Sequence, residues 1–310
     1  MRHVRRIAFR PNVGFGGKSR DTAMVARGCR SRCGAGVVFA AYPLIDIEIA
    51  RWFFDGEAAQ FPIARNADWL SIRKSLNWIP YLFVLPALFV LLRKIVFPGS
   101  PMPIAPSVVL FLIGSLIAGP GIATNVVLKD NWGRPRPNHI QQFAGTADFK
   151  PWWQPGGACP RNCSFVSGEA SQAYWLVAPA MLAPPPLRPA AMGVAVVFGT
   201  SVGALRVAFG RHFVSDVVFA AVITIAIVIG FYWLLLDPIR RNDARLERAI
   251  ERGAIALHRS AGGLLAGAGN ALTHAGRALW QAGQRWQAYI ASLKPVPDYP
   301  HWTEKPDSLV

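Results

Sequence analysis

Charged side chains are scarce in this chain of 310 residues. Asp, Glu, Lys and Arg together make up 16% of the sequence, whereas soluble domains carry roughly a quarter, and apolar residues make up 52%. This composition excludes an ordinary soluble domain. It favours a protein that exposes most of its surface to lipid.

Acidic residues are the scarcest charged type. The chain has 17 Asp and Glu against 33 Lys and Arg, a formal net charge of +16. Such an excess can indicate nucleic-acid binding, which needs a basic surface with interleaved aromatic side chains. Here the basic residues crowd 2–32 and 240–285, while apolar runs fill the middle. We therefore expect membrane lipids as a partner and no nucleic acid.

Cysteine is also rare, with four residues arranged as two pairs, Cys29 with Cys33 and Cys159 with Cys163. Neither pair has the two-residue spacing common in zinc sites, and the two pairs are expected on opposite sides of a membrane. We expect no metal and no cofactor. A secretory signal peptide is not expected either, because the basic N-terminal stretch is too long and no apolar run precedes residue 34.

The apolar runs predict five good membrane spans and one doubtful one, judged against the roughly 20 residues that cross a bilayer. The doubtful first span carries Asp46 and Glu48 near its far end, where we place them at the interface. The predicted spans are 34–54, 79–96, 104–128, 167–183, 189–209 and 212–236.

The distribution of Lys and Arg near the span ends predicts the orientation. The N-terminal tail, the turn at Arg93 and Lys94, the turn at Arg188 and the tail from Arg240 would share the cytoplasmic side. The segments 51–78, 129–166 and 206–215 would lie on the opposite side. They are basic as well, so they need another reason to carry charge.

Those outer segments contain three blocks of residues suited to binding an anion or to catalysis. The first is Lys-Asp-Asn-Trp-Gly-Arg-Pro-Arg-Pro at 129–137, and the second is Cys-Ser-Phe-Val-Ser-Gly-Glu-Ala-Ser at 163–171. The third is Arg-Val-Ala-Phe-Gly-Arg-His-Phe-Val-Ser-Asp at 206–216. Each block begins or ends a predicted span on the same side of the membrane, so the three are expected to meet.

Together the blocks predict an anion site beside a nucleophile. Lys129, Arg136 and Arg206 can converge on a phosphate group through charge-assisted hydrogen bonds. Ser167 and Gly168 precede a predicted helix, whose N–H groups can hold further phosphate oxygens. His212 and Asp216 are four residues apart at a helix start, so the carboxylate can fix the imidazole and leave one nitrogen to attack.

Each residue taken alone has a simpler explanation. A single Lys or Arg at a helix end is more often an anchor for lipid headgroups, and a single His near the interface is usually structural. Trp132, Trp152 and Trp153 in the same loop are sufficiently explained by an aromatic belt at headgroup level. The ordered combination of the three blocks on one face favours the site.

At these residues the sequence resembles the type 2 phosphatidic acid phosphatase family of lipid phosphate phosphatases, whose site is shared with vanadium haloperoxidases. The family pattern is Lys, six residues, Arg-Pro; then Pro-Ser-Gly-His; then Ser-Arg, five residues, His, three residues, Asp. The first block matches fully, and the third has Leu205 in place of serine. In the second block Val166 replaces proline and Glu169 replaces histidine.

The resemblance covers about residues 46–236 and implies a metal-free, two-step reaction in a six-helix core. It implies that His212 attacks phosphorus to give a phosphohistidine, and that Asp216 orients it. Charge on the transferred group would be stabilised by Lys129, Arg136, Ser167, Gly168 and Arg206. The loop around Ser167 is also similar to bacterial members linked to lipid A dephosphorylation.

Glu169 departs from the family where the histidine would protonate the leaving alkoxide, a role commonly worth about 10² to 10⁴ in rate. A glutamate can do this only if its pKa is raised, and the nearby cations act the other way. Three alternatives stay open. Glu169 is the working acid, or acid help comes from elsewhere, with His139 a substitute, or from the leaving group, or the enzyme is slow or dead.

The predicted fold class is therefore all-α, a polytopic membrane protein with a six-helix transmembrane core. We expect a basic disordered tail at 1–33, a phosphatase-like core at 34–237 and a basic cytoplasmic tail at 238–310. The helical pattern of that last tail favours a cationic helix at the membrane surface, with a solvated tail as the alternative.

The predicted function is hydrolysis of a lipid or polyprenyl phosphate at the periplasmic face of a bacterial inner membrane. Lipid A, undecaprenyl diphosphate and phosphatidic acid are the candidate substrates, and the alternative is a catalytically silent protein that binds lipid phosphate. In an oxidising periplasm, a disulfide between Cys159 and Cys163 would tighten the loop before Ser167.

Overall fold

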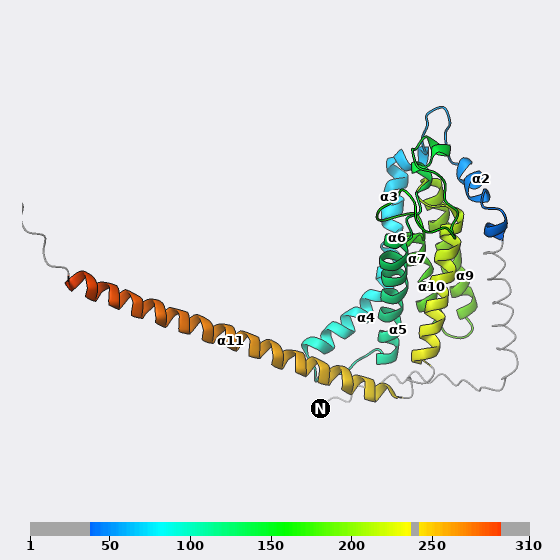
Figure 1. Ribbon diagram of the computed structural model, residues 1–310. Coiled ribbons are helices and arrows are strands. Elements are labelled where there is room, and N and C mark those ends of the chain that lie inside the picture. Colours follow the sequence, from blue (N-terminus) through cyan, green and yellow to red (C-terminus); the bar gives the residue numbers. More distant parts are fainter. Residues whose placement is uncertain (1–37, 237–241, 293–310) are drawn as a thin grey trace, which may run out of the picture. The chain divides into compact units, whose positions relative to one another are not determined.

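The computed structural model describes residues 38–236 and 242–292 (Figure 1). The chain divides into two units, Met1–Ile250 and Glu251–Val310, which are treated separately below. Within the described ranges the regular elements are helices, joined by loops that contain two isolated β-bridges. The all-α class is therefore confirmed.

Four helices in the described part of the chain are long and apolar enough to cross a membrane, and they match four of the predicted spans. The first joins α3 (Ala67–Leu76) to α4 (Ile79–Val96), and the second joins α5 (Pro106–Leu116), η2 (Ile117–Leu128) and α6 (Lys129–Asn131). The third is α9 (Arg188–Ala208), and the fourth joins α10 (Val214–Phe231) to η5 (Tyr232–Leu236).

The other two predicted spans are not found as single long helices. The segment 34–54 begins outside the described residues and continues as the short α2 (Ile45–Arg51). The segment 167–183 is divided into α7 (Gly168–Tyr174) and α8 (Val177–Met181). The six-helix core therefore stays a prediction, and the four long helices are the membrane spans that length and composition support.

Pro179 explains the break between α7 and α8. A proline inside a helix has no N–H to donate and its ring clashes with the carbonyl four residues earlier, here that of Trp175. That carbonyl instead accepts from the N–H of Ala178 at 2.8 Å. The pattern of apolar residues is the same on both sides of the break, so the composition alone predicts one helix.

The apolar core of the bundle lies between α4, α5, α8 and α10. Trp175 is fully buried there, and its indole N–H donates to Ser115 Oγ at 2.9 Å, so the large ring brings no unsatisfied donor into the core. Near the site, α7 packs tightly on α9, because Gly199 leaves room for the ring of Tyr174.

Loops and short helices cover the end of the bundle that carries α2, α3 and α6 (Figure 1). They include η1 (Pro62–Arg65), η3 (Pro137–His139) and η4 (Gln141–Phe143). Phe54, Phe61 and Phe143 hold them together, with ring centroids 5.1 to 5.4 Å apart. This packing fixes the two loops that carry the first and third sequence blocks.

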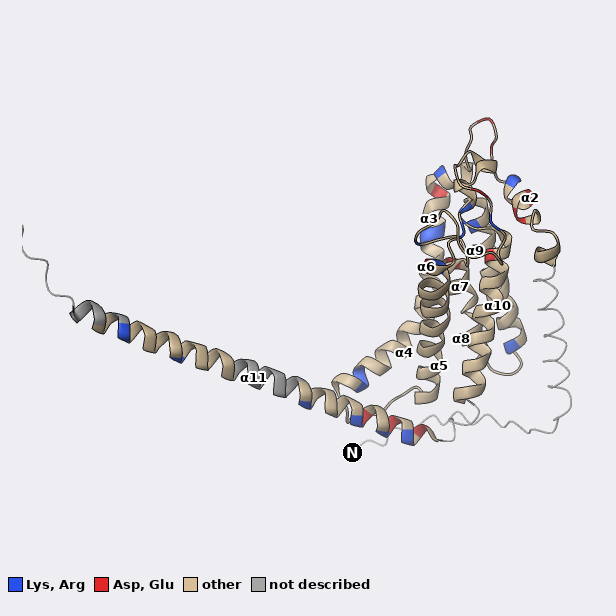
Figure 2. Ribbon diagram, in the orientation of Figure 1, with Lys and Arg blue, Asp and Glu red and all other residues tan. Residues whose placement is uncertain are grey.

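The opposite end of the bundle meets the first turns of α11 (Asp243–Ser292). The buried Lys94 at the end of α4 lies 3.5 Å from Glu247 and donates to the carbonyl of Ser100 at 3.0 Å. Asp243 accepts from the N–H of Ser107 at 3.0 Å. Helix α11 lies in the C-terminal segment whose sequence has a helical pattern. Figure 2 shows charged residues near its start and few along the membrane helices.

Candidate active site

The three sequence blocks meet at the end of the bundle away from Lys94. The N–H of Cys163 donates to the carbonyl of Lys129 at 2.9 Å, which joins the first block to the second. The next residue, Ser164, contacts His212, and the N–H of Ser167 donates to the carbonyl of Asp216 at 3.3 Å. Residues far apart in the chain thus lie in one constellation.

His212 precedes α10 and is 1% exposed. Its Nδ1 lies 2.7 Å from the carbonyl oxygen of Ser164, which can only accept, so Nδ1 carries the proton and Nε2 carries the lone pair. Burial lowers the pKa of His212 to about 4, although the neighbouring Asp216 carboxylate acts to raise it. The imidazole is therefore neutral at pH 7 and keeps a nucleophilic nitrogen.

Asp216 holds His212 less directly than the spacing suggested. Its Oδ2 lies 3.8 Å from Nδ1, too far for a hydrogen bond, and accepts from Ser164 Oγ at 2.5 Å and from the N–H of Phe213 at 2.8 Å. Ser164 therefore connects the carboxylate to the imidazole, because its hydroxyl binds Asp216 and its carbonyl binds His212.

Arg134 is a buried partner of Asp216 that the sequence analysis did not assign. Its side chain is fully buried and donates to Asp216 Oδ1 at 2.5 Å and to Asp46 Oδ2 at 2.8 Å. It also donates to Ser215 Oγ at 2.8 Å and lies over the ring of Phe213, 4.3 Å from the centroid. Two carboxylates and one guanidinium thus form a closed network beneath His212.

Asp46 belongs to this network, although we expected it at the membrane interface together with Glu48. It is 1% exposed, and its carboxylate accepts from both the N–H and the hydroxyl of Ser215. Glu48 is exposed beside Arg51. The first sequence block shows Arg134 two residues before Arg136, but nothing in the sequence connects it to Asp46.

Arg206 occupies the last turn of α9 and is 5% exposed. One of its terminal nitrogens lies 3.5 Å from Glu169, while its buried Nε has no hydrogen-bond partner among the described residues. Lys129 is within electrostatic range of Arg136, Arg206 and Glu169. An unpaired buried N–H of a cation next to further cations fits an anionic ligand.

Gly168 keeps the second block close to the first. A Cβ at this position would lie 2.6 Å from Asn125 Oδ1 and 3.3 Å from Lys129 Nζ. The Ser167 hydroxyl caps α7 by accepting from the N–H of Ala170 at 3.4 Å. Glycine is therefore needed here for close approach, and any larger residue would push Lys129 or Asn125 away.

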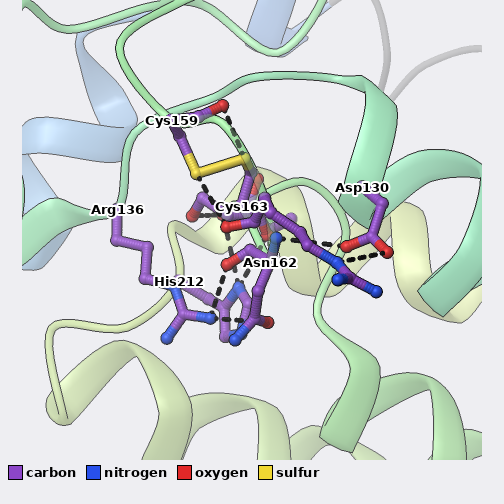
Figure 3. The surroundings of a disulfide bond; sticks show 9 residues. Asp130, Arg136, Cys159, Asn162, Cys163 and His212 are labelled. Carbon is purple, nitrogen blue, oxygen red and sulfur yellow. Dashed lines mark hydrogen bonds and ion pairs between the residues drawn. A yellow bond between two sulfur atoms is a disulfide. The ribbon is translucent and has the colours of Figure 1, made fainter.

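Arg136 is placed by the loop that follows the first block (Figure 3). It donates to the backbone and side-chain oxygens of Asn162 at 2.7 and 2.9 Å. Asn162 in turn lies inside the predicted loop closed by the disulfide between Cys159 and Cys163, which is present in the structure. The disulfide thus stiffens the segment that orients Arg136.

Glu169 lies in the first turn of α7 and faces cations on two sides. Arg73 of α3 donates to it through Nε at 2.9 and 3.1 Å and through Nη2 at 2.5 Å. Burial would raise the pKa of Glu169, but the hydrogen bonds from Arg73 and the charges of Arg206 and Arg73 outweigh burial and lower it to about 2. The carboxylate is therefore ionised at neutral pH.

The other histidine expected on this side, His139, joins the site through its backbone N–H, which donates to the carbonyl of Arg136 at 2.9 Å. It lines a separate cavity of about 330 Å³, with Pro135, Asn138, Gly145, Thr146, Ala147, Ala158 and Cys159. Burial, Arg136 and Arg211 lower its pKa, so it is neutral at pH 7.

Comparison with known proteins decides the family. A family model described as the PAP2 superfamily matches residues 108–240. The lipid A 4'-phosphatase of Francisella tularensis subsp. novicida (strain U112) is 36% identical over 200 residues, which cover 61% of this chain and 85% of that protein. The chain belongs to the PAP2 superfamily.

Two further relatives have the same name. The lipid A 4'-phosphatase of Rhizobium leguminosarum is 34% identical over 193 residues, covering 58% of this chain and 83% of that protein. That of Rhizobium etli is 33% identical over 192 residues, which cover 58% of this chain and 75% of that protein. No solved structure matches the chain. The PAP2 membership and the apolar helices make this chain a membrane lipid phosphatase.

Proposed function

We propose that the chain hydrolyses a phosphate monoester of lipid A, or of a closely similar lipid, through a phosphohistidine at His212. The observation that carries the proposal is the buried, neutral imidazole whose Nδ1 is bound to Ser164, beside Arg206 with its unpaired Nε. A neutral imidazole next to an electropositive pocket is what in-line attack on phosphorus requires.

In the first step Nε2 of His212 forms a bond to phosphorus while the bond to the lipid oxygen breaks, and that oxygen leaves as an alkoxide that takes a proton from water. Water then attacks the phosphohistidine and releases inorganic phosphate and the free imidazole. Lys129, Arg136 and Arg206 stabilise the charge on the transferred group, with the Ser167 and Gly168 N–H groups as further donors.

Asp216 and Arg134 keep His212 ready for this step. When the imidazole becomes attached to phosphorus it carries positive charge, which the Asp216 carboxylate 3.8 Å away stabilises. Arg134 holds that carboxylate in place, and the second hydrogen bond through Ser164 fixes the ring. Asp216 and Arg134 therefore orient the His212 imidazole and stabilise the positive charge that it gains.

The choice of lipid A as substrate rests on the names of the relatives. Undecaprenyl diphosphate, phosphatidic acid and phosphatidylglycerol phosphate are the competing substrates. The purified full-length protein should release phosphate from lipid A that carries a 4'-phosphate faster than from these three. Activity only on another lipid of the panel would reject lipid A while keeping the reaction. Binding of lipid phosphate with turnover of none would favour the silent binding protein.

The site is proposed to face the periplasm of a bacterial inner membrane, with both tails cytoplasmic. Arg73, Arg134 and Arg206 at the site end are engaged in ion pairs, so they do not count as topological signals. Arg93 and Arg188 at the other end favour the cytoplasm. A cysteine at exposed Gln154 should react with an impermeant maleimide in intact cells, and one at Thr273 only after permeabilisation. The reverse labelling would overturn the orientation.

A further inference from the structure

The ion pair between Arg73 and Glu169 lies outside the family pattern. Arg73 belongs to α3, before the residues 108–240 that match the PAP2 model, and its partner is 96 residues away. The guanidinium engages both carboxylate oxygens through two of its nitrogens, the fork geometry that makes Arg–carboxylate pairs strong. The pair therefore fixes α3 to the site.

This geometry leaves Glu169 poorly suited to be the acid. A general acid must carry a proton and bring it within hydrogen-bond reach of the leaving oxygen. Both oxygens of Glu169 already accept hydrogens from Arg73, so a protonated form would place a hydrogen against a cationic donor. Its pKa of about 2 agrees with that reading.

Glu169 instead lies between two cations. Its Oε1 accepts from Arg73 Nη2 at 2.5 Å and is 3.5 Å from Arg206 Nη1. The carboxylate thus holds one edge of the Arg206 guanidinium, and the buried Nε on the other side is left for a ligand. The closer partner is Arg73, which keeps Glu169 from closing a bidentate pair with Arg206.

We infer that Glu169 is a positioning residue for Arg206 and that Arg73 is the cation that makes this role compatible with phosphate binding. The inference rests on the proposed phosphate site. Without Arg73, the buried Glu169 carboxylate would pair fully with Arg206 and compete with phosphate for it. With Arg73, the carboxylate is neutralised and Arg206 keeps its charge for the ligand.

The inference predicts a specific order of phosphate affinity among three proteins: wild type, the double variant and Arg73→Gln. Arg73→Gln should bind inorganic phosphate about ten- to hundredfold more weakly, the range of a hydrogen bond to a charged group. Adding Glu169→Gln to Arg73→Gln should recover part of that loss, because the competing carboxylate is gone. If Glu169 were the acid, or the pair were only structural, the double variant would be no better than Arg73→Gln.

Calorimetric titration of inorganic phosphate into the full-length protein in detergent measures this order without any turnover. Arg51→Gln is the matched control, because it removes the same charge from the exposed pair with Glu48, and its binding should equal wild type. Wild-type affinity in Arg73→Gln, no recovery in the double variant, or no phosphate binding by wild type would each overturn the inference.

Turnover of nitrophenyl phosphate and of the lipid substrate separates the two proposals. A nitrophenolate leaves without a proton, so losing a general acid would slow turnover of the lipid more than turnover of nitrophenyl phosphate. Because Glu169 is not the acid in this inference, Glu169→Gln should lower turnover of both substrates by the same factor. Arg73→Gln should raise KM more than it lowers kcat. A larger loss on the lipid would make Glu169 the acid. If the wild type hydrolyses neither ester but the binding order holds, the proposed function fails while the inference stands.

Discussion

Arg134 at the site and Arg277 on α11 are both arginines, but one is buried and the other is exposed to solvent. Arg134 is fully buried, with Asp46, Asp216 and Ser215 as partners from distant parts of the chain. Arg277 is exposed, and so are Leu272 and Leu279 on the same helix. At Arg134 each hydrogen bond depends on the exact position of one partner. On α11 many exposed residues share the contact of one helix face.

The difference arises from solvation. A buried charge has lost its water and depends on a few fixed partners, so removing one partner leaves another charge uncompensated. An exposed charge keeps its water and its ion pairs contribute little. We therefore expect single substitutions to have large effects at the site and small effects on α11.

The largest effect is expected for His212→Ala, which should lower kcat by at least about 10³-fold, because the nucleophile has no substitute within reach. Phosphate release from the lipid substrate measures it, with inorganic phosphate binding as the check that the pocket is intact. His274→Ala on α11 is the matched control and should keep full activity. Turnover of His212→Ala near that of wild type would remove the phosphohistidine route.

The second effect concerns stability. Arg134→Leu should lower the free energy of unfolding by about 3–5 kcal/mol, because Asp46 and Asp216 are left buried without their cation. Arg277→Leu should change it by less than about 0.5 kcal/mol. Denaturation in the same detergent compares the two. Equal changes in the free energy of unfolding would mean that water reaches the Arg134 network, so that Arg134 does not behave as a buried charge.

The third effect is on the pH dependence. Since burial lowers the pKa of His212 to about 4, kcat/KM per substrate dianion should stay level down to about pH 4 and then fall about tenfold per unit. An ordinary histidine would place this fall near pH 6.5. Stability should also drop between about pH 6.5 and 4, because the unfolded chain binds a proton that the folded chain does not. A fall in activity near pH 6.5 would contradict the buried setting.

The long spans and the residues of the three blocks could be predicted because both depend on local sequence patterns. Apolar runs mark 79–96 and 212–236, and the blocks keep their spacing. The sequence could not predict the Asp46–Arg134–Asp216 network or the Arg73–Glu169 pair, which depend on contacts between residues tens of positions apart. It also joined α7 and α8 into one span, since the apolar pattern outweighed the single Pro179.

The smallest effect is expected on α11, and it tests which alternative for the C-terminal segment holds. At 100° per residue, Leu257, Leu272 and Leu279 share one face, and they are 57%, 74% and 74% exposed. Arg252, Arg259 and Arg277 fall on the opposite face, as expected for a helix lying on an anionic lipid surface. Leu272→Glu should change phosphatase activity less than about twofold, because many residues share the contact.

Spin labels at positions 272 and 277 of the full-length protein in anionic proteoliposomes measure the contact itself. The label at 272 should be relaxed more by oxygen, which concentrates in lipid, and the label at 277 more by a water-soluble nickel complex. Adding salt should weaken this contrast, because the Arg face is held by charge that salt screens. Equal exposure of both labels to the nickel complex would identify a solvated tail, and α11 would then take no part in membrane binding.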